Sequence, residues 1–120
     1  KGSIWATNIG GDIPYPPALS RDTVYAATIQ GKVVALSAAT GEELWSTELD
    51  SDITAPPTVA GDTVLIGSED GRVLGLNAST GIVQWNFQTG GKITGSPVVV
   101  GRTIFVASHD GKLYALIGDE

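Results

Sequence analysis

Cysteine is absent from the 120-residue chain, histidine occurs once and positively charged residues are few. Without cysteine there is no disulfide and no thiolate metal site, although its absence indicates no particular compartment. Seven Lys and Arg residues against thirteen Asp and Glu residues give a net charge of -6. Because nucleic acids and anionic lipids bind positive surfaces, this charge argues against both as partners. No apolar run approaches the ~18 residues of a membrane span and no signal peptide is visible, so we expect no membrane insertion.

The chain contains one pattern of 40 residues that occurs three times in succession, without insertion or deletion. Residues 35–45 return in recognisable form as residues 75–85. Corresponding positions carry the same residue in each copy: Trp5, Trp45 and Trp85; Pro17, Pro57 and Pro97; Gly31, Gly71 and Gly111. Repeats near this length, rich in short alternating strands, are typical of propeller blades. We therefore predict one all-β domain, a β-propeller module with units 1–40, 41–80 and 81–120.

Each unit is expected to form one blade of four short strands and no helix. In the second unit, the strands expected from the central channel outwards are residues 53–59, 63–68, 72–77 and 82–88. Asp70-Gly71 and Asp110-Gly111 are strong signals for tight hairpins between strands. Residues 13–19 contain three prolines, which cannot donate to a strand ladder. We therefore place this strand at a sheet edge, facing the channel.

The two ends of the chain carry matching halves of a blade. Residues 3–9 alternate between apolar and polar side chains and are predicted to be an outer strand, whereas the last blade ends near residue 117 without one. Three blades cannot close a ring, since propellers use roughly four to eight. An open fan would expose strand edges and two apolar faces. We therefore predict a homodimer with a six-bladed ring, in which Trp5 of each chain completes the blade that ends at Leu116 of the other. A fragment of a longer ring remains an alternative.

The repeat resembles the tryptophan-docking repeat of quinoprotein-type propellers, the PQQ-like and BamB-like family. The shared pattern is Ala-x-x-x-x-Thr-Gly-x-x-x-Trp at residues 35–45, then a proline-bearing strand, Gly-Asp-Thr-Val and Asp-Gly-x-Val/Leu. The resemblance covers all 120 residues. It implies an extracytoplasmic location, in the periplasm or cell envelope. It also implies that each tryptophan stacks on a neighbouring blade, held by a Thr-Gly turn; the residues concerned are Trp5, acting across the subunit boundary, Trp45, Trp85, Thr40, Gly41, Thr80 and Gly81.

The resemblance includes both enzymes and non-enzymatic proteins. Quinoprotein dehydrogenases have a pocket for a quinone and a calcium ion, with a catalytic Asp and an adjacent-cysteine disulfide, and this chain has neither the cysteines nor the long insertions. His109 lacks a recognisable serine and carboxylate for a catalytic triad. Nearly identical units also place similar groups at symmetric positions, whereas catalysis needs different groups at one point. We therefore predict no enzyme, no cofactor and no metal site.

Loops on one face of the expected propeller form a candidate binding rim. The rim consists of Asp12, Asp50, Asp52, Glu69, Asp70, His109 and Asp110, with Tyr15 on the channel-facing strand. Such an acidic rim would suit a cation or a basic peptide. Alternatively, the Asp-Gly aspartates serve hairpin geometry or solubility, and the Tyr15 ring fills the channel.

Three functions remain open from the sequence. The chain is a non-catalytic scaffold or a module that binds a protein or peptide, a fragment of a dehydrogenase-like quinoprotein propeller, or an excised or engineered propeller fragment without selected activity.

Overall fold

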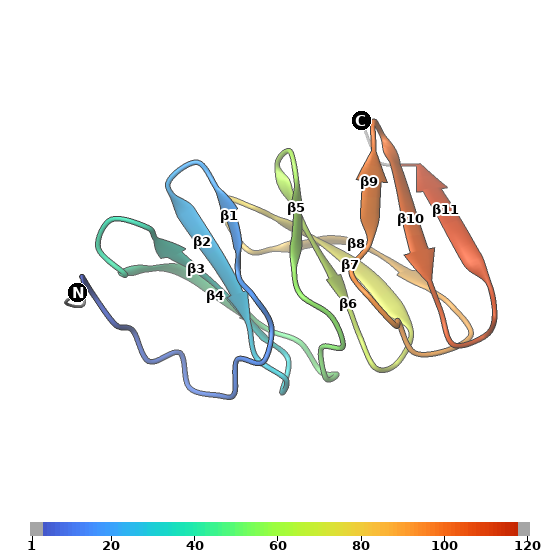
Figure 1. Cartoon of the computed structure of the whole chain (residues 1–120), viewed down its shortest axis with the longest axis horizontal. Coiled ribbons are helices and arrows are strands. Elements are labelled where there is room, and N and C mark those ends of the chain that lie inside the picture. Colours follow the sequence, from blue (N-terminus) through green and yellow to red (C-terminus); the bar gives the residue numbers. More distant parts are fainter. Residues whose placement is uncertain (1–3, 118–120) are drawn as a thin grey trace.

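The structure, a computed structural model, describes residues 4–117, and all regular elements in this range are strands (Figure 1). The eleven strands are β1 (Ala18–Ser20), β2 (Thr23–Ala27), β3 (Lys32–Ser37), β4 (Glu43–Glu48), β5 (Thr58–Ala60), β6 (Thr63–Gly67), β7 (Arg72–Asn77), β8 (Val83–Gln88), β9 (Val98–Val100), β10 (Thr103–Ala107) and β11 (Leu113–Ile117). The all-β prediction is confirmed.

The strands form three antiparallel sheets, each made of strands that are consecutive in the chain. We call them blade 1 (β1–β4), blade 2 (β5–β8) and blade 3 (β9–β11). The pairing register repeats with the sequence period: the second and third strands pair Thr23 with Ser37 in blade 1 and Thr63 with Asn77 in blade 2. The blades stand side by side along the molecule (Figure 1). Within residues 4–117, blade 3 has three strands, as expected for a blade without its outer strand.

The innermost strands are shorter than predicted. Residues 53–59 were expected to be a strand, but β5 begins only at Thr58 and Ile53 makes an isolated bridge with Ser68. Between these points lie Pro56 and Pro57, which have no N–H group to donate to a ladder. The same reason explains why the expected strand over residues 13–19 is reduced to β1, which begins at Ala18.

The N-terminal segment, residues 4–9, does not form the predicted strand. A strand is defined by a ladder partner, and none of the described strands pairs with this segment. Residue 3, also part of that prediction, lies outside the described range. The segment nevertheless packs on blade 1, because Trp5 and Ile9 form a hydrophobic cluster with Ala26, Val34 and Leu36.

The hydrophobic core lies between the blades. Trp45 of blade 1 belongs to the same buried cluster as Ile66 and Leu74 of blade 2. A second cluster joins Val73 of blade 2 to Ile104 of blade 3. Because successive side chains of a strand point to opposite faces, the neighbours Val73 and Leu74 face different blades. Blade 2 is therefore buried on both of its faces.

Candidate functional site

An open depression of about 370 Å³ lies on the face where the interblade linkers meet the β2–β3, β6–β7 and β10–β11 turns. We call it the loop-face depression. Its lining includes Tyr15, Ile29, Asp52, Ile53, Thr54, Glu69, Lys92 and His109. Ile29, Glu69 and His109 occupy the same position in the three units, and Asp52 and Lys92 correspond in the second and third, whereas Tyr15 has no counterpart in the lining.

Backbone hydrogen bonds fix this wall. The Glu69 N–H donates to the Asp52 carbonyl at 2.8 Å, and the His109 N–H donates to the Lys92 carbonyl at 2.9 Å. Each linker is thereby held against the turn of the blade that it enters. The Ile53 N–H also donates to the Ile29 carbonyl at 2.9 Å, which connects blade 2 to blade 1. The positions of the side chains around the depression follow from the repeat itself.

The structure brings together four of the eight predicted rim residues: Tyr15, Asp52, Glu69 and His109. Within residues 4–117, the carboxylates of Asp52 and Glu69 have no hydrogen-bond or ion-pair partner. Lys92 also lines the depression, so its lining carries a positive charge as well as negative ones. Asp12 is exposed and contributes its carbonyl to a bond from Ile29 rather than a side chain to the depression. The rim is thus not uniformly acidic.

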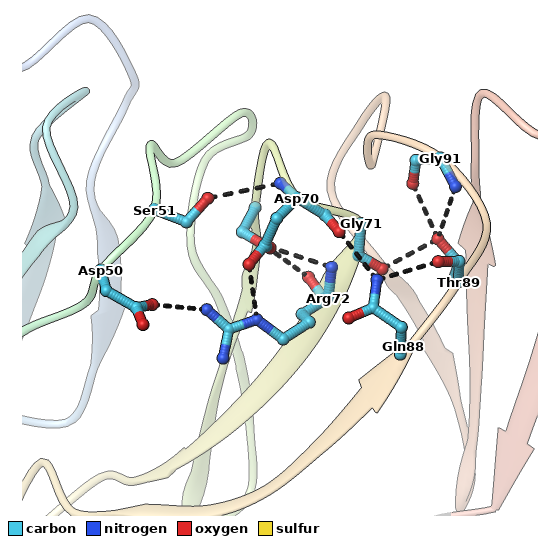
Figure 2. A network of polar contacts seen from close by, with 9 residues as sticks. Asp50, Ser51, Asp70, Gly71, Arg72, Gln88, Thr89 and Gly91 are labelled. Atoms are coloured by element: carbon cyan, nitrogen blue, oxygen red, sulfur yellow. Dashed lines mark hydrogen bonds and ion pairs between the residues drawn. The ribbon is translucent and has the colours of Figure 1, made fainter.

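Asp50 and Asp70 belong to a separate polar network, shown in Figure 2, that is centred on Arg72. The Arg72 guanidinium donates to Asp50 at 2.6 Å and to Asp70 at 2.8 Å. Burial opposes ionisation of Asp70, but the hydrogen bond from Ser68, together with the charge and hydrogen bonds of Arg72, outweighs it and lowers the Asp70 pKa. The hydrogen bond to Asp50 raises the pKa of Arg72. These two aspartates are therefore already paired within the protein.

The network continues from blade 2 towards blade 3. The Gln88 amide donates to the Asp70 carbonyl at 2.7 Å, and the Thr89 hydroxyl donates to the Gly71 carbonyl at 2.8 Å (Figure 2). The same hydroxyl lies 2.8 Å from the Gly91 carbonyl in the next linker. This arrangement ties the β6–β7 turn to the linker between blades 2 and 3. Its role is to hold the loop face together.

Asp110 is also engaged within the protein. Its carboxylate accepts a hydrogen bond from the Tyr114 hydroxyl and further bonds from the N–H groups of Lys112 at 2.9 Å and Gly90 at 3.0 Å. The Tyr114 hydrogen bond is the largest of the effects that lower the pKa of Asp110 to about 2. The Tyr114 ring is itself packed edge-on against Phe87. Asp110 thus connects the linker that follows blade 2 to the β10–β11 turn of blade 3.

This arrangement predicts that Asp110 contributes to the loss of stability at low pH, in addition to Asp70, whose pKa is also lowered. Because the pKa of Asp110 is lower in the folded than in the unfolded chain, its stabilising effect is complete above about pH 4 and is lost as the pH falls towards 2. In Asp110→Asn, the free energy of unfolding should fall less steeply over this range than in the wild type. Urea denaturation at several pH values measures the free energy of unfolding of both proteins over this range. Tyr114→Phe should flatten the acid limb in part, and an unchanged slope in both variants would contradict the assignment.

Tyr15 forms a fixed wall of the depression. Its hydroxyl donates to the Ile53 carbonyl at 3.0 Å, and its ring packs against the cluster between blades 1 and 2. Nearby, the Thr54 hydroxyl oxygen is buried and has no hydrogen-bond partner among the described residues. The predicted rim did not include Ile29 or Thr54, because an apolar residue in a turn and a threonine in a strand carry no distinctive signal.

The tryptophan side chains connect neighbouring units. The Trp45 indole N–H donates to the Ala78 carbonyl at 2.9 Å, and the Thr47 hydroxyl donates to the Gly81 carbonyl at 2.5 Å. The Trp45 ring lies so close to Gly81 that a Cβ atom there would overlap with it. Thr80 shapes this turn, since its side chain accepts a bond from the Ile82 N–H at 3.3 Å.

The same contacts recur one unit earlier, within one chain. Trp5 donates to the Ala38 carbonyl at 3.0 Å and covers Gly41, while Thr40 shapes the turn as Thr80 does. Trp85 lies against Gly75 of its own blade. The turn that would correspond to residues 78–81 falls at positions 118 onwards, outside the described residues.

A larger depression of about 680 Å³ lies at the opposite end, between blades 2 and 3, with Trp85, Asp62 and Arg102 in its lining. Between blades 1 and 2, the turn at residues 78–81 packs on Trp45 at the corresponding place. The equivalent positions in the third unit lie beyond residue 117, so we assign no site here.

Two further properties of residues 4–117 bear on function. No group of three or more His, Asp or Glu side chains in this range is arranged to hold a metal ion. The range also contains no helix with the length and apolar character needed to cross a membrane.

Several solved structures share this architecture. BamB from Moraxella catarrhalis matches 95% of the chain with 29% identity and a TM-score of 0.84, and the chain spans 36% of the length of that protein. The computationally designed Ika4 protein matches 86% of the chain and 64% of its own length, with 20% identity and a TM-score of 0.77. A quinohemoprotein alcohol dehydrogenase from Pseudomonas putida matches 92% of the chain over 20% of its own length, with 22% identity and a TM-score of 0.81.

The designed protein and the dehydrogenase share only the fold with this chain at such identities. Together with BamB they confirm that the three sheets are blades of a β-propeller. No curated protein matches the chain by sequence. The model of the family described as outer membrane protein assembly factor BamB, however, matches residues 2–119. The family resemblance of the repeat is thereby confirmed, and the chain belongs to the family of the outer membrane protein assembly factor BamB.

Proposed function

We propose that this chain is a non-catalytic propeller scaffold that binds a protein partner at the loop-face depression, through a basic segment of that partner. The observation that carries the proposal is the pair of carboxylates of Asp52 and Glu69, which line an open depression and have no partner within residues 4–117. Their backbones are joined by a 2.8 Å hydrogen bond, so both carboxylates come from one small region of the wall.

The composition of the wall favours a peptide over a simple cation. Two carboxylates can accept hydrogen bonds from a lysine or arginine side chain, and such charged bonds contribute about 1.5–3 kcal/mol each. Lys92, which also lines the depression, has an ammonium group that can donate to a backbone carbonyl of the same segment. The net charge of -6 adds long-range attraction for a basic partner.

The remaining parts of the molecule support a scaffold role. We propose that Trp5 and Trp45 dock each unit onto the next, since each donates to a turn carbonyl and covers a turn glycine. Membership of a family named for outer membrane assembly supports an extracytoplasmic location. We favour this function over a fragment of a dehydrogenase-like quinoprotein propeller or a fragment without selected activity, because two carboxylates without a partner within residues 4–117 line an open depression.

The proposal is tested by calorimetric titration of the chain with a lysine-rich peptide at low salt. The double variant Asp52→Asn with Glu69→Gln should weaken binding about tenfold or more, the equivalent of 1.4 kcal/mol. The matched control, Asp22→Asn with Asp62→Asn, removes the same charge from exposed turns on the opposite face and should bind like the wild type. Equal losses in both double variants, or no binding by the wild type, would refute the proposal.

A further inference from the structure

We propose that Arg72 is a positioning residue for the loop-face depression, because it holds together the linker and the turn that carry the carboxylates of Asp52 and Glu69. This role rests on the proposed function, since it concerns the same two carboxylates. Arg72 is not among the residues that line the depression, so its contribution to binding is indirect.

The linker between blades 1 and 2 departs from the repeat at the point where it meets Arg72. It consists of Asp50, Ser51 and Asp52, whereas the first two of these positions are both glycine in the other units. The other units also have lysine at the position of Arg72. The second unit therefore has polar side chains at two linker positions where the other units have no side chain at all.

Both of these side chains bond to the β6–β7 region (Figure 2). The Arg72 guanidinium donates through Nη2 to Asp50 at 2.6 Å and through Nε to Asp70 at 2.8 Å. The Ser51 hydroxyl accepts a hydrogen bond from the Asp70 N–H at 3.3 Å. Two successive residues of the linker are thereby fixed against the turn, one through Arg72 and one directly.

These bonds adjoin the two carboxylates of the depression along the chain. Asp52 directly follows Ser51, and Glu69 directly precedes Asp70. The carboxylates have no partner of their own within residues 4–117, so their separation depends on the backbone that carries them. Groups that are already held in place lose less freedom on binding and therefore bind more tightly. The contacts of the linker with the turn thus determine how well the two carboxylates are arranged for a ligand.

Arginine suits this place better than the lysine of the other units. Its guanidinium presents several N–H donors in a rigid plane, so two of its nitrogens can serve two carboxylates at once. Without it, Asp50 and Asp70 would be like charges on facing segments, and their repulsion would separate the linker from the turn. Arg72 therefore supports an acidic site by its geometry, although its charge is opposite to that of the site.

The direction in which Arg72→Gln changes peptide binding tests this role. The variant loses one positive charge and changes the net charge from -6 to -7, so long-range attraction alone would make a lysine-rich peptide bind more tightly. Loss of positioning should instead weaken binding about threefold or more in calorimetric titration, at unchanged stoichiometry. The matched control Lys32→Gln removes the same charge at the equivalent position of blade 1 and should bind at least as tightly as the wild type.

The outcomes distinguish this role from the proposed function. If Asp52→Asn with Glu69→Gln loses binding while Arg72→Gln binds as tightly as the wild type or more tightly, Arg72 is not a positioning residue and the proposed function stands. A lower stoichiometry with unchanged affinity in Arg72→Gln would indicate partial unfolding and would also overturn the positioning role. If the wild type does not bind the peptide, both are overturned.

A second measurement needs no ligand. The Glu69 N–H donates to the Asp52 carbonyl at 2.8 Å, and the His109 N–H makes the equivalent bond to the Lys92 carbonyl at 2.9 Å. In Arg72→Gln, hydrogen exchange of the Glu69 amide should become about threefold faster or more, whereas that of the His109 amide should not change. Equal acceleration at both amides would indicate a global loss of stability, and no change at either would show that the linker is held without Arg72. Either result would overturn the positioning role.

Discussion

Replacing Trp45 with alanine is expected to lower the free energy of unfolding by about 3–5 kcal/mol, the usual cost of removing a large buried aromatic side chain. Trp45 is buried between blades 1 and 2, where its ring contacts that of Tyr25 with centroids 6.0 Å apart. Its indole N–H and the Tyr25 hydroxyl both donate to the Ala78 carbonyl, so the substitution removes a bond as well as packing. The loss should be measured by urea denaturation.

Leu44→Ala is the matched control for this experiment. Leu44 precedes Trp45 on β4 but is 54% exposed, so its removal should change stability by about 0.5 kcal/mol or less. A similar loss in both variants would mean that the blades are not held together by the tryptophan contact. Trp5→Ala, which makes the equivalent contact at the partly exposed end of the chain, is expected to cost less than Trp45→Ala.

The second large effect is expected for Gly71→Ala, with a loss of about 3 kcal/mol. Gly71 has a φ angle of +88°, and a Cβ atom there would lie 2.6 Å from the Gly91 carbonyl oxygen. The left-handed conformation costs a residue other than glycine about 1 kcal/mol or more, and forcing an atom into a packed site adds about 1–3 kcal/mol. The carbonyl belongs to the backbone of the linker, so it cannot move without disturbing the Thr89 bonds.

Gly61→Ala separates these two contributions. Gly61 also has a positive φ angle, +59°, but no atom lies within 4 Å of the Cβ position. This variant should therefore lose only the conformational term, about 1 kcal/mol. Thermal or urea denaturation of the two variants should show the difference. If Gly61→Ala were as unstable as Gly71→Ala, close packing of the linker on the β6–β7 turn would not be the cause.

Much of the fold could be predicted from the period alone. The strand over residues 72–77 was predicted with the observed bounds of β7, because Arg72–Asn77 lies between an Asp-Gly hairpin and a Thr-Gly turn. The inner strands were overestimated, since hydrophobic pattern favoured a strand across Pro56 and Pro57 where the ladder cannot form. The N-terminal segment has the pattern of an outer strand, but a ladder partner is a tertiary property. The sequence pattern therefore cannot show whether the segment has a ladder partner.

The candidate site was only half predictable. Asp52, Glu69 and His109 converge because linkers and turns of an up-and-down sheet meet at one end, which the strand order already implies. The pairing of Asp50 with Arg72, 22 positions away, depends on side-chain directions that no repeat pattern encodes. The bond from Tyr114 to Asp110 was also missed, because the equivalent residues Val34 and Leu74 are apolar and the repeat gave no signal for it.

The central claim, that the loop-face depression binds a basic segment, is tested most directly by backbone amide spectra of the labelled chain during titration with a lysine-rich peptide. We predict saturable shifts of the amide signals of Asp52, Glu69 and His109, with those of Asp22 and Asp62 on the opposite face unchanged. Shifts confined to the opposite face, or none at millimolar peptide, would contradict it.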